Sequence, residues 1–395
     1  MTPNRFADRV QRLQPYLFAE LERRIQEKRE AGHDVISLGI GDPDLPTPEI
    51  VVEELQRAVG RPDTHQYPSN WGRQSFREAI ASFYADRFGV TLDPANQVLP
   101  VLGGKEGIFH ICFAMLDAGD VALGTDPGYP VYTSGPLLAD AEPYMLPIGP
   151  ENGFKPDLAS IPADVLARAR MLFINYPNNP TGAVLEEGDT FFEEVVQFAR
   201  DNDLWVVHDN AYSEISFDGY RAPSFLSTPG AMEVGVEMFS LSKAWNMTGW
   251  RVGACVGNPD VVRMLWKLKT NVDSGMFDAI QLAAAKALTD AREFPAEMSR
   301  IYQRRRDLVV EALRGIGLDV EPPKGTIYVW VRVPEGYTSA SFCELVLDQA
   351  NVVVSPGSSY GDSGEGFIRI SLSTPDDRLR EAISRIETSL RVPTA

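Results

Sequence analysis

Five short apolar runs, separated by stretches of helical periodicity, constrain the fold of this chain more than any other feature. The runs occupy residues 98–102, 121–123, 171–174, 204–207 and 238–241. Strands that are apolar along their whole length are buried on both faces, and strands that alternate with helices usually run parallel. The pattern therefore predicts an α/β fold whose large domain has a mostly parallel sheet covered by helices.

The two ends of the chain have a different pattern. From about residue 296 a long helical stretch precedes alternating strands at residues 327–333 and 367–371, which predicts a smaller α+β domain. Near the N-terminus, Leu17, Leu21 and Ile25 recur every four residues before Gly32, as in an amphipathic helix with a glycine stop. We expect this helix to join the small domain, which makes that domain discontinuous. The predicted division is residues 1–48 (arm and part of the small domain), 49–295 (large domain) and 296–395 (small domain).

The charge balance narrows the classes of partner. The chain has 55 Asp and Glu residues against 37 Lys and Arg residues, a net charge of −18. Such an acidic chain repels polyanions and anionic lipid, so we expect no nucleic-acid and no membrane partner. Small-molecule substrates are the better expectation.

Cysteine usage and hydropathy bear on metal binding and location. Cys112, Cys255 and Cys343 are odd in number and lack CxxC spacing, so neither a disulfide framework nor a thiolate zinc site is predicted. No apolar run approaches the ~18 residues of a membrane span. Arginines at positions 5, 9 and 12 interrupt the N-terminus where a signal peptide needs its apolar stretch. We expect a cytoplasmic protein without a metal.

Polar residues follow each apolar run, at the edge where doubly wound sheets bind ligands. They form the segments 103–107, 126–132, 175–182, 208–214 and 242–251. Taken singly, each segment has an ordinary structural explanation. The glycines suit a turn, the tyrosines suit packing, Asp209 suits a helix N-cap and Lys243 suits a solvated charge.

Together, the segments supply what pyridoxal 5′-phosphate (PLP) requires. Its aldehyde needs a lysine, its ring nitrogen a carboxylate, and its phosphate needs hydroxyls, backbone amides and an arginine. Ser240, Lys243 and Arg251 have the matching spacing. The stretch 240–253, together with the Asn-Asn-Pro-Thr-Gly at 178–182, resembles the signature of fold-type I aminotransferases of class I/II. The family's motifs occur in order from about residue 35 to 373.

The resemblance implies three catalytic residues: Lys243, Asp209 and Tyr212. Lys243 matches the lysine that holds the cofactor's aldehyde and carries the proton between substrate and cofactor. Asp209 matches the carboxylate that keeps the ring nitrogen protonated, so that the ring accepts electrons. Tyr212 and Asn179 match the hydrogen-bond donors to the cofactor's phenolate oxygen.

The resemblance implies further contacts to the cofactor. Tyr129 lies where the family stacks an aromatic side chain on the ring. The phosphate partners are implied to be the backbone amides of Gly104 and Lys105, the side chains of Ser240 and Arg251, and Tyr67 from a neighbouring subunit.

Substrate binding is implied mainly at Arg369, which matches the arginine that grips the α-carboxylate with its planar fork. Its apolar neighbours Ile368 and Ile370 predict a buried strand, which argues against a surface salt bridge. Further substrate contacts are implied at Gly41, Asn179, Tyr67 and Asn271. Because the family is dimeric with shared sites, we expect a homodimer that acts on an amino acid and a 2-oxo acid.

Several stretches are similar to bacterial LL-diaminopimelate aminotransferases, which implies a place in lysine biosynthesis. These stretches are 61–68, 104–108, 126–132, 208–219, 271–275 and 364–366. The sequence departs from that pattern at Gly103 (Ser expected), Asn210 (Ala), Trp245 (Tyr) and the pair Asn70-Trp71. The alternatives are an alanine or other 2-oxo-acid aminotransferase, or a PLP enzyme of secondary metabolism such as an oxidase or lyase. A non-enzymatic PLP-binding regulator is disfavoured, because no residues remain for an effector or DNA-binding extension.

Overall fold

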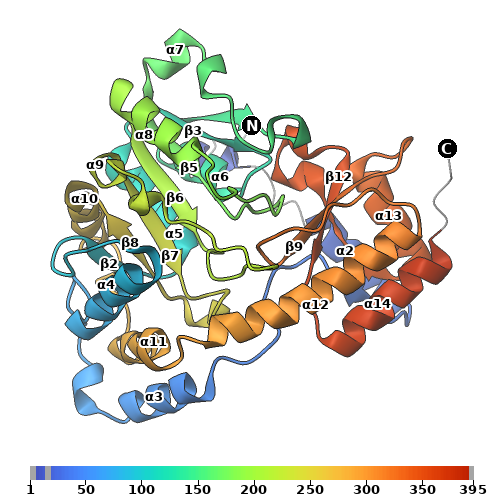
Figure 1. Ribbon diagram of the computed structural model, residues 1–395, viewed down its shortest axis with the longest axis horizontal. Helices are drawn as coiled ribbons and strands as arrows, with labels where there is room; N and C mark the ends of the chain where they lie inside the picture. The colour runs from blue at the N-terminus through green and yellow to red at the C-terminus, as the bar shows by residue number, and fades with distance from the viewer. Residues whose placement is uncertain (1–5, 14–18, 391–395) are drawn as a thin grey trace.

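The structure, a computed structural model, describes residues 6–13 and 19–390. Figure 1 shows two lobes joined by the long helix α12 (Phe294–Gly315), one built around a large sheet and the other around a small sheet. Within the described residues, no helix combines the length and the apolar character needed to cross a membrane.

The large sheet has seven strands in the order β2-β8-β7-β6-β5-β3-β4. Only β8 runs antiparallel to its neighbours, so the predicted mostly parallel sheet is confirmed. The five apolar runs form β2, β3, β5, β6 and β7, whereas β4 and β8 were not predicted. The strands are β2 (Val98–Val101), β3 (Val121–Asp126), β4 (Glu142–Pro147), β5 (Ala169–Ile174), β6 (Trp205–Asn210), β7 (Gly235–Ser240) and β8 (Gly253–Gly257).

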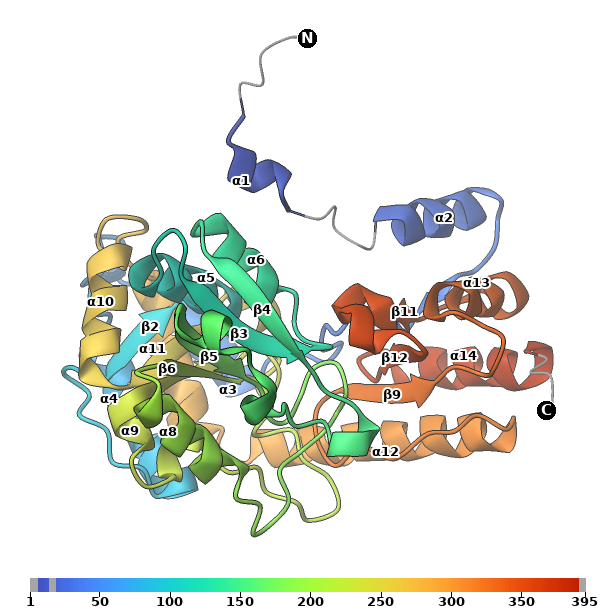
Figure 2. The same ribbon diagram turned by 90° about the horizontal axis from the view of Figure 1, so that it is seen from above.

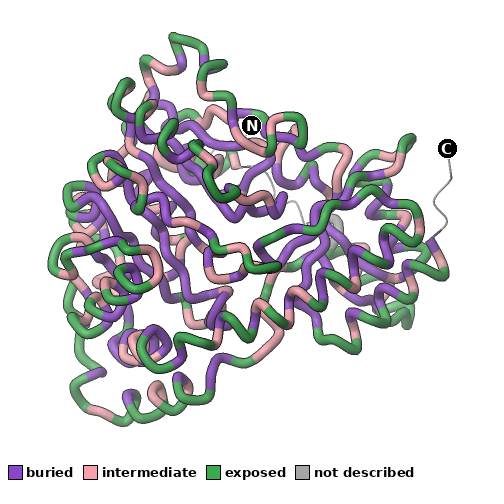
Figure 3. Tube along the Cα trace, viewed as in Figure 1, coloured by how far each residue is buried: buried purple, intermediate pink, exposed green. Residues whose placement is uncertain are grey.

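Helices cover both faces of this sheet and bury it (Figures 1 and 3). One face packs against α5 (Gly104–Met115), α6 (Val131–Leu138) and α10 (Pro259–Lys269). The other face packs against α4 (Gln74–Phe88), α8 (Phe191–Asp201) and α11 (Asp278–Asp290), and α3 (Glu49–Val59) lies on α11. The short helices α7 (Ala163–Leu166) and α9 (Ala231–Val234) complete this lobe.

The second lobe contains an antiparallel sheet in the order β11-β12-β9. Its strands are β9 (Tyr328–Arg332), β11 (Ser355–Pro356) and β12 (Phe367–Ser371), and its helices are α13 (Ser339–Ala350) and α14 (Asp376–Ser389). The predicted strands and the long helix near residue 300 are therefore confirmed.

The N-terminal segment lies against this second lobe. Strand β1 (Ile36–Ser37) pairs in parallel with β10 (Val352–Val353), and α2 (Ala19–Glu30) lies beside α13 in Figure 2. Helix α2 ends just before Gly32, whose φ of +87° suits glycine, although Leu17 lies outside the described residues. A single turn, α1 (Asp8–Gln11), precedes it and contacts α6. The domain boundaries given above remain a prediction.

Candidate active site

A cavity of about 1350 Å³ opens between the two lobes at the carboxyl edge of the large sheet. Strand ends of the large sheet form one side, and β9, β12 and the segment around residue 40 form the other. The predicted site residues that line it are Gly41, Gly104, Lys105, Tyr129, Asn179, Asp209, Tyr212, Ser240, Lys243, Arg251 and Arg369. The structure therefore brings together residues that are up to about 330 positions apart in the chain.

Asp209 lies near the end of β6 and is 7% exposed. Its Oδ2 accepts a hydrogen bond of 2.9 Å from the hydroxyl of Tyr132, and its carbonyl accepts one from Asn175. Burial raises the pKa of Asp209 to about 6, although the Tyr132 hydrogen bond opposes this. Its position inside a cavity suits a partner for a positively charged ring nitrogen. The N-cap explanation fails, because Asp209 lies inside a strand.

Lys243 follows β7 and extends its amine into the cavity. The Nζ atom donates a hydrogen bond of 2.6 Å to the carbonyl of Gly41, which belongs to the opposite side of the cavity. Burial lowers the pKa of Lys243. A lysine with a lowered pKa has more of its amine neutral, which is the form that attacks a carbonyl carbon.

Arg369 lies on β12 and is 5% exposed, so the surface salt bridge is excluded. Its Nη1 donates to Oδ1 of Asn179 at 2.8 Å and its Nη2 to the carbonyl of Gly39 at 2.9 Å. The buried Nε has no hydrogen-bond partner, and no carboxylate among the described residues pairs with the guanidinium. A buried cation without an anion is costly, so the cavity is built to receive a negatively charged group.

Two tyrosines that are not among the predicted site residues contact residues of the site. Tyr132 bonds to Asp209 as described above. The hydroxyl of Tyr328, on β9, lies 3.2 Å from the hydroxyl of Tyr212, and the ring of Tyr328 stacks on the guanidinium of Arg369. Burial alone would raise the pKa of Tyr328, but the charges of Arg369 and Lys243 outweigh it and lower the pKa. The only signal for Tyr328 was its place in a predicted strand.

The glycine turn before α5 borders the cavity, and Gly104 and Lys105 line it. Gly103 has a φ of +85°, and a side chain there would overlap the guanidinium of Arg251. Helix α5 begins at Gly104, so its first backbone N–H groups are free of helical partners, and the guanidinium of Arg251 lies beside this helix start at Gly103. Backbone donors, an arginine and Ser240 at the cavity wall suit a phosphate.

Tyr67 and Asn271 lie outside this cavity. Tyr67 is 91% exposed, and Asn271 is exposed and donates to the carbonyl of Lys267. A residue that contributes to the site of a neighbouring subunit is expected to be exposed and to lie outside the cavity of its own chain. Their roles remain predictions.

Three of the departures from the expected pattern, Asn210, Trp245 and Trp71, lie outside the cavity of this chain. Asn210 points into the core and donates to Glu237, and Trp245 is fully buried with its indole N–H on the carbonyl of Ala291. Trp71 stacks on Trp266 of α10, with ring centres 5.1 Å apart. None of these three residues lines the cavity of its own chain.

Comparison with known proteins supports what this geometry indicates. The sequence profile of the family "Aminotransferase class I and II" matches residues 33–386, nearly the whole chain. The chain belongs to this family. It is therefore an enzyme that transfers amino groups, and the fold and reaction class expected from the sequence are confirmed.

Individual relatives cover this aminotransferase almost completely. LL-diaminopimelate aminotransferase of Moorella thermoacetica is 53% identical over 384 residues, which span 97% of this chain and 98% of the relative. The substrate-bound structure of BacF from Bacillus subtilis has a TM-score of 0.92 at 38% identity, covering 97% of both chains. A mutant aspartate aminotransferase of Thermus thermophilus has a TM-score of 0.90 at 29% identity, covering 98% of this chain and all of that one.

Proposed function

We propose that the chain is a PLP-dependent LL-diaminopimelate aminotransferase, with glutamate and 2-oxoglutarate as the second substrate pair. The observation that supports an amino acid as substrate is Arg369, a buried guanidinium whose Nε has no partner. The same cavity holds the amine of Lys243 and the carboxylate of Asp209. This set suits a substrate that brings a carboxylate and an amino group to one reacting carbon.

The residues present fit PLP. Lys243 would supply the amine for its aldehyde, Asp209 the charge for its ring nitrogen, and Asn179 and Tyr212 the hydrogen bonds to its phenolate oxygen. The turn at Gly104 and Lys105, with Ser240 and Arg251, would hold its phosphate, and Tyr129 would cover the ring. When bound, PLP supplies an electron sink for the negative charge that develops at the substrate's α-carbon.

The protein's own groups then have separate tasks. Arg369 binds the α-carboxylate with its planar fork, and Asn179 fixes the fork through Oδ1. The amine of Lys243 would be the base that takes the proton from the substrate's α-carbon and passes it to the cofactor. Gly41 accepts from that amine and holds it in the cavity. Asp209, which is buried and accepts a hydrogen bond from Tyr132, would stabilise positive charge at the ring nitrogen.

The choice of LL-diaminopimelate rests on relatives. Proteins of that name from Moorella thermoacetica and from Dehalococcoides mccartyi are 53% and 51% identical over almost the full length of this chain. Asn210 and Trp245 point into the core, so these two departures give no reason for a changed substrate. Trp71 stacks on Trp266 in the segment of Tyr67, which we propose reaches the neighbouring site.

We also propose a homodimer whose subunits complete each other's sites. Exposed apolar side chains belong to two neighbouring segments here. The ring of Phe277 lies 6.3 Å from the ring of His65, two residues before Tyr67, and Gly275, between Val272 and Phe277, lies against Pro68. Tyr67, Val272 and Phe277 are 91%, 58% and 38% exposed in the single chain. A second copy of this chain would cover them.

A panel of kcat/KM values tests the substrate assignment. The amino donors are LL-diaminopimelate, its meso isomer, alanine, aspartate, arginine and an aromatic amino acid, each with 2-oxoglutarate. We expect LL-diaminopimelate to be the best substrate. A tenfold advantage for any single-headed amino acid, about 1.4 kcal/mol in transition-state binding, would overturn the assignment and leave the aminotransferase class intact.

A further inference from the structure

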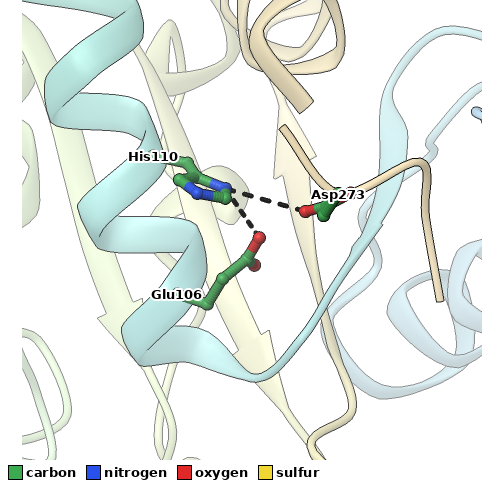
Figure 4. A group of neighbouring side chains, drawn as sticks. All are labelled: Glu106, His110 and Asp273. Atoms are coloured by element: carbon green, nitrogen blue, oxygen red, sulfur yellow. Dashed lines mark ion pairs between the residues drawn. The ribbon is translucent and has the colours of Figure 1, made fainter. Parts of the chain in front are cut away.

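A cluster of half-buried charged side chains around the buried Lys269 joins α5 to the end of α10 and the loop after it. Figure 4 shows Glu106 and His110 on α5 facing Asp273. The Nδ1 atom of His110 lies 2.6 Å from Glu106 and 3.9 Å from Asp273. Lys269, the last residue of α10, is 3% exposed and donates to both carboxylates at 2.5 Å.

The cluster has the residue types of a metal site, but Lys269 already fills the place of a cation. Its ammonium lies at hydrogen-bond distance from Oε1 of Glu106 and Oδ2 of Asp273, the same two oxygens that face His110. Burial alone would raise the pKa of Glu106, but His110 and Lys269 outweigh it and lower the pKa to about 2. We therefore read the cluster as a set of internal ion pairs.

On one side, the cluster reaches the glycine turn of the cavity. Oε2 of Glu106 accepts a hydrogen bond of 2.9 Å from the backbone N–H of Leu102. This bond closes the turn that contains Gly103 and Gly104, directly before the first N–H groups of α5. Glu106 itself points away from the cavity, so its effect on a ligand there passes through the backbone.

On the other side, the cluster reaches the loop beside Tyr67. Oδ1 of Asp273 accepts a hydrogen bond of 2.8 Å from the N–H of Gly275, and the backbone N–H of Asp273 donates to the carbonyl of Lys269. Gly275 has a φ of +98° and lies against Pro68. The ammonium of Lys269 thus holds the loop that carries Asn271, and the segment that carries Tyr67 packs against this loop at Pro68.

We propose that Lys269 is a positioning residue that sets the phosphate-binding turn of its own active site through Glu106 and the loop offered to the neighbouring site through Asp273. This inference rests on the proposed function, because it assigns the turn to the phosphate of PLP and the loop to the partner's substrate. A single buried ammonium then links cofactor retention in one subunit to substrate binding in the other.

The test compares two lysine variants of the PLP-loaded enzyme. Lys269→Met keeps an unbranched side chain of similar length and removes the charge. Lys286→Met is the matched control, since Lys286 pairs with Asp290 in the same i,i+4 geometry at 2.5 Å on the surface of α11. PLP release is followed by absorbance during dialysis into cofactor-free buffer, and KM for the amino donor is measured with saturating PLP.

We expect Lys269→Met to release PLP at least tenfold faster than the control and to raise KM at least fivefold. Asp273→Asn should raise KM while PLP release stays within twofold of the wild type. Glu106→Gln should speed PLP release with a smaller effect on KM. A cluster that only stabilises the fold would lower the melting temperature in all three variants without this split.

Two results would overturn the inference. One is PLP release from Lys269→Met within twofold of Lys286→Met. The other applies if Lys269→Met does not fold: Glu106→Gln and Asp273→Asn then change PLP release and KM to the same extent. Failure of the proposed function is distinct, because in that case the wild-type protein itself takes up no PLP.

Discussion

The guanidinium carbon of Arg369 lies 3.9 Å from the ring centre of Tyr328. The ring of Tyr360 lies 4.7 Å from the same carbon, so the guanidinium has an aromatic ring on two sides. Stacking fixes the plane of the guanidinium, and the hydrogen bonds to Asn179 and Gly39 fix its rotation within that plane. The arginine is thus held in place before a carboxylate arrives, which lowers the entropy cost of binding.

Replacing Tyr328 should weaken carboxylate binding. Tyr328→Leu removes one stacking surface, and a desolvated cation–π contact is worth about 2 kcal/mol, so KM should rise roughly thirtyfold. The increase should appear for both the amino donor and the 2-oxo acid, because Arg369 serves both. Tyr328→Phe keeps the ring and is the control. Equal effects of the two variants would show that the hydroxyl, not the stacking, matters.

Gly41 should not tolerate a side chain. A methyl group there would overlap the hydroxyl of Tyr328, which cannot retreat because its ring is stacked on Arg369. Overpacking of this kind costs about 1–3 kcal/mol, and the displaced carbonyl would no longer hold Lys243. We expect Gly41→Ala to lower kcat/KM at least tenfold, as measured by steady-state kinetics.

Two controls locate that effect. Gly315→Ala, at the end of α12 with open space around it, should leave kcat/KM unchanged. Adding Tyr328→Phe to Gly41→Ala removes the hydroxyl but leaves two ring carbons 2.6 Å from the added methyl group, so it should restore little of the loss. A wild-type kcat/KM for Gly41→Ala alone would contradict the close approach of Gly41 to the side chain of Tyr328.

The large sheet could be predicted because its central strands carry their own signal. A strand that is buried on both faces, such as residues 171–174 within β5, is apolar whatever surrounds it. Strands β4 and β8 lack that signal. Strand β4 is partly exposed at the sheet edge, and β8 consists of Gly, Ala, Cys and Val, whose small side chains do not stand out from a loop.

The same reasoning separates the predictable site residues from the others. Asp209 and Lys243 could be found because they follow or end strands, and the carboxyl ends of parallel strands meet at one edge. Tyr328 could not, because its side chain faces the cavity only once the small lobe packs on the large one. Tyr132 reaches Asp209 from the start of α6, and only the fold sets that distance.

Lys243 should carry the cofactor covalently. Its amine has a lowered pKa and lies inside the cavity, so it is the lysine most able to attack an aldehyde. Borohydride treatment of the holoenzyme, followed by peptide mass spectrometry, should place the reduced adduct on Lys243. Lys243→Ala should still bind PLP and lose turnover. An adduct on Lys105, which also lines the cavity, would contradict the assignment.

Asp209 should make the stability of the apoprotein depend on pH. Its folded pKa of about 6 lies above the ordinary value of 3.8, so the folded state binds the extra proton. The contribution of Asp209 to the free energy of unfolding is therefore greatest below about pH 4 and is lost as the pH rises through 6. The loss is about 3 kcal/mol for about two pKa units.

Urea unfolding of the apoprotein at several pH values measures this. The wild type should lose stability relative to Asp209→Asn between pH 4 and pH 7, while the exposed Asp319→Asn variant should track the wild type. A constant difference between wild type and Asp209→Asn across that range would show that Asp209 does not titrate there.

Tyr67 should complete the active site of the neighbouring subunit. Its side chain is 91% exposed and lies outside the cavity of its own chain, so Tyr67→Ala should disturb only the partner's site. Lys243→Ala disables the site of its own subunit. In a mixed dimer, one site then contains both an intact Lys243 and an intact Tyr67, and the other contains neither.

Mixing the two inactive variants after subunit exchange should therefore restore activity. With random pairing, half of the dimers are mixed and each has one intact site of two, so activity should reach about a quarter of the wild-type value. Exchange is verified by pulling down an affinity-tagged subunit with its untagged partner. The control mixes Lys243→Ala with Asp209→Ala, both of which disable the subunit that carries them, and should remain inactive. No recovery in the Tyr67 mixture, with exchange verified and each variant inactive alone, would mean that each site is built from one chain.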